Sequence, residues 1–126
     1  MELTLRPLDV ENDLPRLAEL INLVKTEPIT ADVLRDREAK WSEKGVRQRL
    51  VATDATGRIV AYGCAQKRDY EPPDRFGVLV IVDRECRNRG IGSRLFSESE
   101  DFARQQGGTR LRAYVRDNDT VTQEFE

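Results

Sequence analysis

Residues 76–96 constrain the fold most, because an apolar run, a polar loop and a helical pattern follow one another there without a break. The run from Phe76 to Val82 is short and rich in β-branched residues, which predicts a buried central strand. Residues 83–89 are polar or small, and the apolar spacing from Ile91 onward predicts a helix that begins near Gly90. The chain therefore places the N-terminus of a helix directly after a central strand.

Two glycines, Gly90 and Gly92, flank Ile91 at the expected start of this helix. The first N–H groups of a helix have no intrahelical partner, and the helix dipole is positive at that end. Glycine also allows a ligand to approach the main chain closely. Together these features predict a binding site for a polyphosphate.

The hexapeptide Arg87-Asn88-Arg89-Gly90-Ile91-Gly92 has the pattern R-x-x-G-x-G. A dinucleotide-binding loop would need a third glycine where the chain has Leu95, and a P-loop would need Lys-Ser or Lys-Thr after its last glycine. The hexapeptide instead resembles the [Q/R]-x-x-G-x-[G/A] signature of the GNAT family of acetyl-CoA-dependent N-acetyltransferases. Its position between a strand and a helix strengthens this resemblance.

Length and charge narrow the class of protein. A chain of 126 residues predicts one domain. The formal net charge is −2, and basic and acidic residues are interspersed, so we expect neither a nucleic-acid partner nor a membrane surface. No signal peptide or membrane-spanning run is recognisable, and we expect a cytoplasmic protein.

The residue types present exclude several chemistries. The chain has no histidine, which argues against a Ser-His-Asp triad and against an ordinary zinc site, so no metal is expected. Its two cysteines are Cys64, in an expected strand, and Cys86, in the polar loop. Without a histidine to activate it, Cys86 is expected to be an incidental thiol rather than a nucleophile.

The first part of the chain predicts a strand and two helices. The strand covers residues 2–8, and Asp13 is positioned to cap the first helix. The apolar stripe of that helix is formed by Leu14, Leu17, Leu20, Ile21 and Val24. Thr30 is expected to cap a second helix over residues 31–41, with its buried side formed by Val33, Leu34 and Trp41.

The remainder of the chain predicts a hairpin, the strand and helix described above, and one more strand. The hairpin covers residues 46–67 with its turn at 54–58, and a loop follows at 68–75. The helix after Gly90 should stop at Gly107-Gly108, and residues 110–115 alternate as a strand. Residues 118–126 are expected to begin a last helix.

The resulting order, β-α-α-β-β-β-α-β-α, matches the GNAT fold, a mixed and mostly antiparallel α/β sheet flanked by helices. The resemblance covers the whole chain as a single domain, residues 1–126. Family members continue through a C-terminal hairpin, which we expect to be missing here. The strand at 110–115 would then have an uncovered edge, and we expect self-association into a homo-oligomer through it.

The resemblance also implies a binding site for acetyl-CoA as co-substrate. Main-chain N–H groups of the signature loop would hold the pyrophosphate, and the pantetheine arm would pair with the main chain at Val80 and Val82. The N–H of Val80 would polarise the thioester carbonyl, and Asn118 matches a family Asn beyond the fifth strand. The loop residues concerned are Arg87, Asn88, Arg89, Gly90, Ile91, Gly92 and Ser93.

The proton-transfer groups of the family are harder to find in this chain. Many members use a Glu early in the central strand, where this chain has Phe76, so Tyr70, Glu71 and Asp74 just upstream are the nearest titratable candidates. A Tyr seven residues after the Asn often protonates the thiolate, but position 125 is a Phe. Tyr114 is a candidate substitute, although the alternation of its strand predicts an ordinary aromatic residue on the face of the sheet.

Three functions remain open from the sequence. The first is an N-acetyltransferase in which a small-molecule or peptide amine attacks acetyl-CoA directly. The second is a CoA-binding module without turnover, such as one domain of a tandem GNAT protein. The third is an interaction domain in which Gly90 and Gly92 only permit close helix–sheet packing. A cationic acceptor would be favoured if the acidic residues Glu27, Asp32, Glu71 and Asp74 converge.

Overall fold

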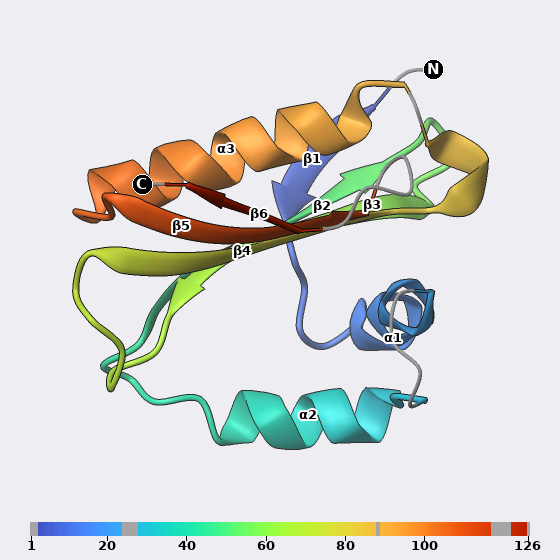
Figure 1. The fold of residues 1–126 in the computed structure, drawn as a ribbon. Coiled ribbons are helices and arrows are strands. Elements are labelled where there is room, and N and C mark those ends of the chain that lie inside the picture. Colours follow the sequence, from blue (N-terminus) through green and yellow to red (C-terminus); the bar gives the residue numbers. More distant parts are fainter. Residues whose placement is uncertain (1–2, 24–27, 88, 117–121, 126) are drawn as a thin grey trace.

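The computed structural model describes residues 3–23, 28–87, 89–116 and 122–125, with side chains described as far as Arg116. One six-stranded sheet forms its centre, with the strands in sequence order from β1 to β6. All neighbouring strands are antiparallel except β4 and β5, which run parallel (Figure 1). The strands are β1 (Thr4–Pro7), β2 (Val46–Thr53), β3 (Ile59–Lys67), β4 (Arg75–Val82), β5 (Arg110–Arg116) and β6 (Thr122–Phe125).

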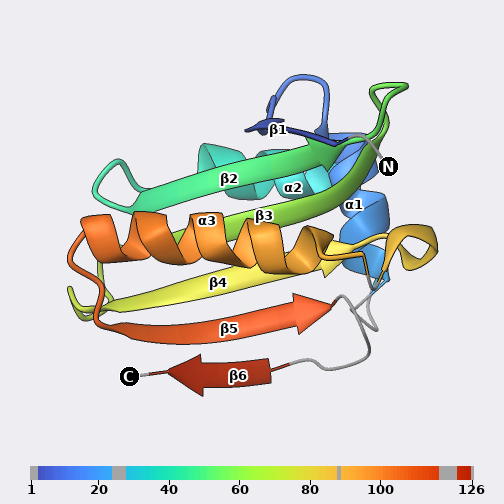
Figure 2. The same ribbon diagram turned by 90° about the horizontal axis from the view of Figure 1, so that it is seen from above.

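Helices cover both faces of the sheet (Figures 1 and 2). α3 (Ile91–Gln105) lies on one face, whereas α1 (Leu14–Asn22) and α2 (Ala31–Ala39) lie on the other. A short 3₁₀ turn, η1 (Arg84–Cys86), follows β4. Parallel strands need a crossover connection, and α3 supplies it between β4 and β5, so α3 begins where β4 has ended.

Most elements expected from the sequence are confirmed. The hairpin of β2 and β3, the central strand β4 and the crossover helix α3 all form where their patterns indicate. α3 stops before Gly107, which has a φ of 89° that favours glycine. Thr30 caps α2, because its hydroxyl oxygen accepts a hydrogen bond of 3.2 Å from the N–H of Val33.

Asp13 precedes α1 as expected, but its side chain does not cap that helix. Its carboxylate instead accepts hydrogen bonds from the guanidinium of Arg6, at 2.7 and 3.1 Å, and from the N–H of Asp9, at 2.7 Å. These bonds join β1 to the start of α1.

The core between α3 and the sheet depends on one very close approach. Leu95 and Ser99 of α3 lie directly over Gly63 of β3, where a Cβ would come within 3.1 Å of the Leu95 Cβ. Both α3 residues are almost fully buried. The glycine that brings this helix close to the sheet is therefore Gly63, in the middle of the hairpin.

The opposite face of the sheet has a smaller core, formed mainly by α1. Leu14, Leu17 and Leu20 of α1 pack there against Val51 and Ile81 of the sheet. The expected apolar stripe of α1 is thus confirmed over the described residues, and Val24 lies outside them.

α2 is held in a different way, because none of its residues is buried. Of the buried side expected for this helix, only Leu34 packs against the core under α1, and it is half-buried. Val33 is 41% exposed, and Trp41 lies beyond the end of the helix. The carboxylate of Glu38 bonds the guanidinium groups of Arg47, at 2.7 Å, and Arg49, at 2.6 and 3.0 Å. Ion pairs to β2 therefore attach the C-terminal half of α2 to the sheet.

The C-terminal segment also differs from expectation. Residues 122–125 form the strand β6, not a helix, and they pair antiparallel with residues 111–114 of β5. A strand satisfies main-chain groups of β5 that a helix would have left unpaired. The expectation that the strand at 110–115 has an uncovered edge is therefore wrong. β6 is now the outer strand, and self-association through that edge stays a prediction.

The close approach at Gly63 gives a test of the fold. Gly63→Val should lower the free energy of unfolding by about 1–3 kcal/mol, because its side chain would overpack against Leu95 and Ser99. Gly77→Val is the matched control on the neighbouring strand, since its Cβ would meet only the Gln66 carbonyl oxygen at 3.9 Å. Urea unfolding of the two variants measures the difference, and equal losses would contradict the proposed packing.

The attachment of α2 predicts a dependence of stability on pH. Burial raises the pKa of Glu38, but the hydrogen bonds and charges of Arg49 and Arg47 outweigh it and leave the pKa below its ordinary value. A carboxylate with a lowered pKa in the folded state stabilises the protein above its unfolded pKa of ~4.3, and this contribution is lost as the pH falls through the folded value. Wild type should thus lose more stability than Glu38→Gln between pH ~5 and ~3.

The control for this effect is Asp32→Asn, whose carboxylate pairs with Arg35 on the same helix but is 93% exposed. Its unfolding free energy should follow that of wild type over the same pH range. Parallel curves for wild type and Glu38→Gln would show that the ion pairs do not attach α2.

Candidate functional site

The end of β4 and the start of α3 form a rigid turn. Asp83 follows β4, and its carboxylate accepts a hydrogen bond from the N–H of Glu85 at the start of η1. The same carboxylate is paired with Arg16 of α1 and with Arg58 of the β2–β3 turn. Burial raises the pKa of Asp83, but these partners, Arg16 first, lower it below its ordinary value. These contacts fix the position of Asp83, the residue at which the loop begins.

Gly90 supplies the turn into α3. Its φ is 82° and its ψ is 1°, a left-handed conformation that glycine adopts without strain. A Cβ at Gly90 would meet no atom within 4 Å, so packing does not require this glycine. The requirement is conformational, and the open space beside Gly90 leaves room for a ligand. The hypothesis that Gly90 and Gly92 serve only close helix–sheet packing therefore does not fit the geometry at Gly90. For Gly92, which is buried, it stays a prediction.

The surroundings of this helix start are basic. The first turn of α3 contains no acidic residue, and Arg89 and Arg94 are exposed on either side of Gly90. Arg87 lies at the opening of the loop, half-buried. Ser93 is exposed in the first turn, whereas Ile91 and Gly92 are buried. Asn88 lies outside the described residues, as does Asn118.

Arg87 connects the loop to the central strand. Its Nε donates a hydrogen bond of 3.0 Å to the carbonyl oxygen of Val82, the last residue of β4. Its Nη2 is buried and has no hydrogen-bond partner among the residues that the structure describes. The side chain thus covers the end of β4 with one donor still available.

The main chain of β4 alternates between its two neighbours. The N–H of Asp83 donates to the carbonyl of Val60 on β3, so Val80 and Val82, at odd spacing from Asp83, direct their main-chain groups to the β5 side. β5 pairs with β4 as far as Ile81 and Arg116. The edge at Val80 is therefore next to β5, and only Val82 lies beyond the paired region.

The candidate bases lie at the other end of β4. Tyr70, which is 77% exposed, and Glu71 belong to the loop before β4, and the Glu71 carboxylate accepts a hydrogen bond from the N–H of Arg68. Asp74 is six residues before Val80, roughly 20 Å along the strand at ~3.3 Å per residue. The structure does not bring these three residues together with Val80. Phe76, at the position of the usual Glu, is buried in the core under α3.

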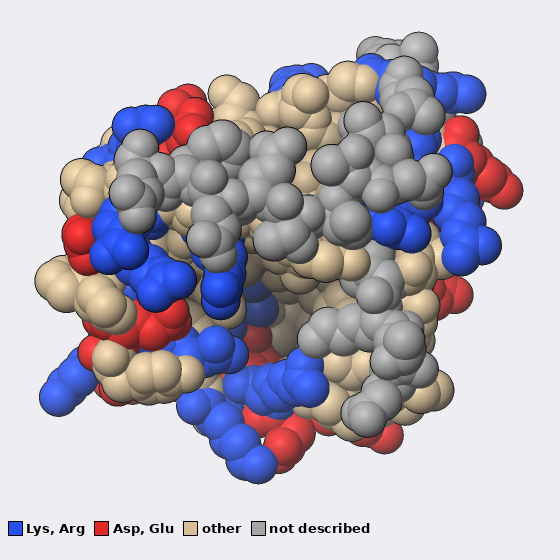
Figure 3. Space-filling view, viewed as in Figure 1, with Lys and Arg blue, Asp and Glu red and all other residues tan. Residues whose placement is uncertain are grey.

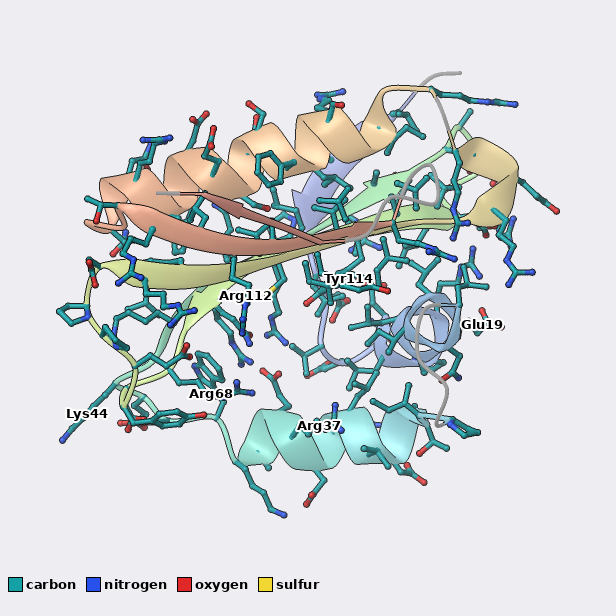
Figure 4. The ribbon with its side chains drawn as sticks, viewed as in Figure 1. Glu19, Arg37, Lys44, Arg68, Arg112 and Tyr114 are labelled. Atoms are coloured by element: carbon teal, nitrogen blue, oxygen red, sulfur yellow. The ribbon has the colours of Figure 1, made fainter. Side chains whose placement is uncertain are left out.

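Tyr114 lies closer to Val80 along the sheet than these residues do. It is half-buried on β5 in register with Leu79, one residue from Val80. Figure 4 shows Tyr114 on the face of the sheet that carries α1 and α2. Tyr62 lies on the same face, but burial raises its pKa well above the ordinary value. Of these two tyrosines, Tyr114 is the one that lies on β5 and is more exposed to solvent.

The same face of the sheet carries several arginines that are far apart in sequence and were not expected to lie together. One row across the sheet consists of Arg47 on β2, Gln66 on β3, Gly77 on β4 and Arg112 on β5. The signal was present in the alternation of each strand, but it becomes visible only when the register joins the strands. Figure 3 shows Lys and Arg atoms around a hollow between the sheet and α2.

Neither cysteine is activated. Cys64 is 5% exposed and Cys86 is 6% exposed, and burial is the main cause that raises the pKa of both thiols. Within the described ranges, no three His, Cys, Asp or Glu side chains are grouped so as to hold a metal ion. No helix among the described residues is long and apolar enough to cross a membrane.

Solved structures share this architecture. A proposed phosphinothricin N-acetyltransferase is 27% identical with a TM-score of 0.71, over 89% of this chain and 71% of that one. A phosphinothricin acetyltransferase from Sinorhizobium meliloti, in complex with acetyl-CoA, is 20% identical with a TM-score of 0.76, over 92% and 67%. A tandem GNAT protein from the clavulanic acid biosynthesis pathway is 22% identical with a TM-score of 0.69, over 89% and 36%.

Sequence comparison gives the same family. No curated protein matches the sequence significantly. The family model described as "Acetyltransferase (GNAT) family" matches residues 14–125, which run from the first residue of α1 to the last residue of β6. The matched region includes the turn at Gly90 and the arginine-lined loop before it. This chain therefore belongs to the acetyltransferase (GNAT) family.

Proposed function

We propose that this protein transfers the acetyl group of acetyl-CoA to a primary amine. The observation that carries the proposal is the left-handed turn at Gly90, which opens the N-terminus of α3 beside three arginines. Helix N-termini favour anions, and the diphosphate of CoA is such an anion. The Sinorhizobium meliloti relative was solved in complex with acetyl-CoA, which supports the same ligand here.

The pyrophosphate would be held by main-chain N–H groups of residues 87–92 and Ser93. Each charge-assisted hydrogen bond of this kind contributes about 1.5–3 kcal/mol. Arg89 and Arg94 are exposed beside the turn and would add a favourable charge. Asn88 and Asn118 complete the predicted set.

The pantetheine arm would pair with the main chain of β4 at Val80 and Val82. The end of β5 must then move away from β4, because the two strands are paired as far as Ile81 and Arg116. Arg87 must also release or share the Val82 carbonyl, to which its Nε donates. Binding would thus exchange protein hydrogen bonds for hydrogen bonds to the ligand.

The reaction itself is a direct transfer. The nitrogen lone pair of the amine attacks the thioester carbonyl carbon, and the oxygen becomes an oxyanion that accepts a hydrogen bond from the N–H of Val80. Losing one such donor typically costs ~10²-fold or more in rate. The C–S bond then breaks, the amide nitrogen loses its proton, and the thiolate of CoA takes up a proton.

The two proton steps need different groups. An amine of pKa ~10.4 is less than about 0.1% free base at pH 7, so its proton must be lost before attack. Roles for Tyr70 and Glu71 as base stay predictions, and their distance from Val80 requires water to relay the proton. We propose Tyr114 as the acid that protonates the thiolate, because it lies one row from Val80 on β5.

A second candidate is a CoA-binding module without turnover. The paired end of β4 and β5 and the distant candidate bases favour it. Release of free thiol from acetyl-CoA with a panel of amines separates the two, since a module would bind CoA and release none. A cytoplasmic location stays a prediction for either function.

The phosphate site predicts opposite effects on binding and on stability. Ser93→Glu places a negative charge in the first turn of α3, where the helix dipole favours it, so the free energy of unfolding should not fall. The same charge should repel the diphosphate and weaken CoA binding by about tenfold or more. Calorimetric titration with CoA measures this loss.

Ser97→Glu is the matched control, because Ser97 is exposed on α3 one turn further along. It adds the same charge away from the helix start and should leave CoA affinity within about twofold of wild type. Unchanged affinity in Ser93→Glu would remove the phosphate site from the proposal.

The proposed acid gives a kinetic prediction. Tyr114→Phe removes the phenol without emptying its space, so kcat should fall about tenfold or more while the affinity for acetyl-CoA stays the same. Steady-state thiol release measures kcat, and titration measures the affinity. The same assay on Tyr70→Phe tests the competing residue. A fall in kcat for Tyr70→Phe but not for Tyr114→Phe would contradict the assignment.

A further inference from the structure

The face of the sheet under α2 carries more positive than negative groups. Glu38 is the shared partner of Arg47 and Arg49, so two guanidinium groups lie on one carboxylate. Arg68 approaches from the β3–β4 loop, where its guanidinium carbon is 6.0 Å from the ring centroid of Trp41. The arginine cluster, which we define as Arg47, Arg49 and Arg68, is thus only partly neutralised by Glu38.

The acidic side chains described near this cluster have hydrogen-bond or ion-pair partners. The carboxylate of Asp69 accepts a hydrogen bond of 2.9 Å from the hydroxyl of Ser42, and that of Glu71 accepts one of 2.9 Å from the main-chain N–H of Arg68. Asp32 pairs with Arg35 on α2. Each of these three carboxylates thus has a partner within the protein.

The ring of Trp41 contacts two arginines of the cluster, Arg47 and Arg68. The guanidinium carbon of Arg47 lies 4.3 Å from its ring centroid, a cation–π contact that fixes this arginine in place. Burial and the charge of Arg49 lower the pKa of Arg47. Arg47 is therefore held in place by Trp41 and partly buried, and the positive charge of Arg49 beside it favours an additional anion.

The register leaves space in front of the cluster. Gly77 lies between Gln66 and Arg112 in the row that begins at Arg47, and a Cβ there would meet only one atom within 4 Å. Arg47 and Arg112 are three strands apart, roughly 14 Å between main chains at ~4.8 Å per strand. Arg68 and Arg112 lie on the side of the sheet that faces α2 (Figure 4), where the surface is hollowed (Figure 3).

We propose that this hollow binds an oxyanionic group of the acceptor, so that the acceptor is an amine that also carries a carboxylate, phosphonate or phosphinate. The inference rests on the proposed function, because the amine must reach the thioester beside Val80. Guanidinium groups match these oxyanions by bidentate hydrogen bonds. The structure thus points to an anionic acceptor. A cationic acceptor stays a prediction, because Glu27, one of the acidic residues on which it depends, lies outside the described residues.

The distance along β4 limits the size of the acceptor. Gly77 is three residues before Val80, about 10 Å at ~3.3 Å per residue. Arginine side chains are long and reach part of this distance. An acceptor with several bonds between its amine and its oxyanion can therefore contact both positions.

Binding can be tested without turnover through Trp41, the one tryptophan of the chain. We would titrate its fluorescence with 4-aminobutyrate, 1-aminobutane and 1,4-diaminobutane, which share a four-carbon amine but differ in charge at the far end. Only 4-aminobutyrate should give a saturable change. Arg68→Gln and Arg112→Gln, both at exposed positions, should weaken that response at least tenfold.

The control variant is Arg104→Gln, an exposed arginine on α3 across the sheet. It should bind 4-aminobutyrate as wild type does. Thiol release from acetyl-CoA gives the kinetic counterpart, in which kcat/KM should be at least tenfold higher for 4-aminobutyrate than for 1-aminobutane. Arg68→Gln should remove most of that preference through KM.

The outcomes separate the two proposals. A selective, arginine-dependent fluorescence response without thiol release from any amine would support the anion site and overturn the transfer activity. Thiol release with equal kcat/KM for all three amines, and no selective response, would overturn the anion site and support the transfer. A response that Arg104→Gln weakens as much as Arg68→Gln would also overturn the anion site, because it would reflect net charge only.

Discussion

The parallel pairing of β4 with β5 is the constraint on which the rest of this structure depends. Parallel neighbours need a crossover, so α3 must return along one face of the sheet, and its N-terminus must follow β4. Gly90 makes that return possible at the required angle because it adopts a positive φ. The turn at Gly90 and the position of the basic loop at the end of β4 are thus consequences of one pairing.

Local patterns predicted the elements well, and contacts between distant residues explain the misses. The β-branched run of β4 and the apolar spacing of α3 each required only neighbours in sequence. β6 could not be foreseen, because its partner is the main chain of β5 and its own sequence is short and polar. The expected buried side of α2 was only partly right, because Leu34 packs against the core whereas Val33 is exposed and ion pairs from Glu38 attach the C-terminal half of the helix.

The candidate site was only half predictable for the same reason. A loop motif is contiguous, so Arg87 and Gly90 could be found from spacing alone. The arginine row that ends in Arg47 and Arg112 spans four strands and exists only once the register is known. Likewise, Tyr70 and Glu71 are near β4 in sequence, but they lie before its first residue whereas Val80 is near its last.

The two faces of the sheet differ in how well they tolerate substitutions during evolution, because α2 is attached partly by ion pairs. The α3 side of the sheet tolerates little change, since Gly63 and Leu95 nearly touch and their packing supports the whole domain. α2 itself contains no buried residue, and substitutions at its exposed positions cost little packing energy. Charged side chains on the exposed surface of α2 can therefore change by drift, while the packing of α3 on the sheet preserves the fold and the turn at Gly90.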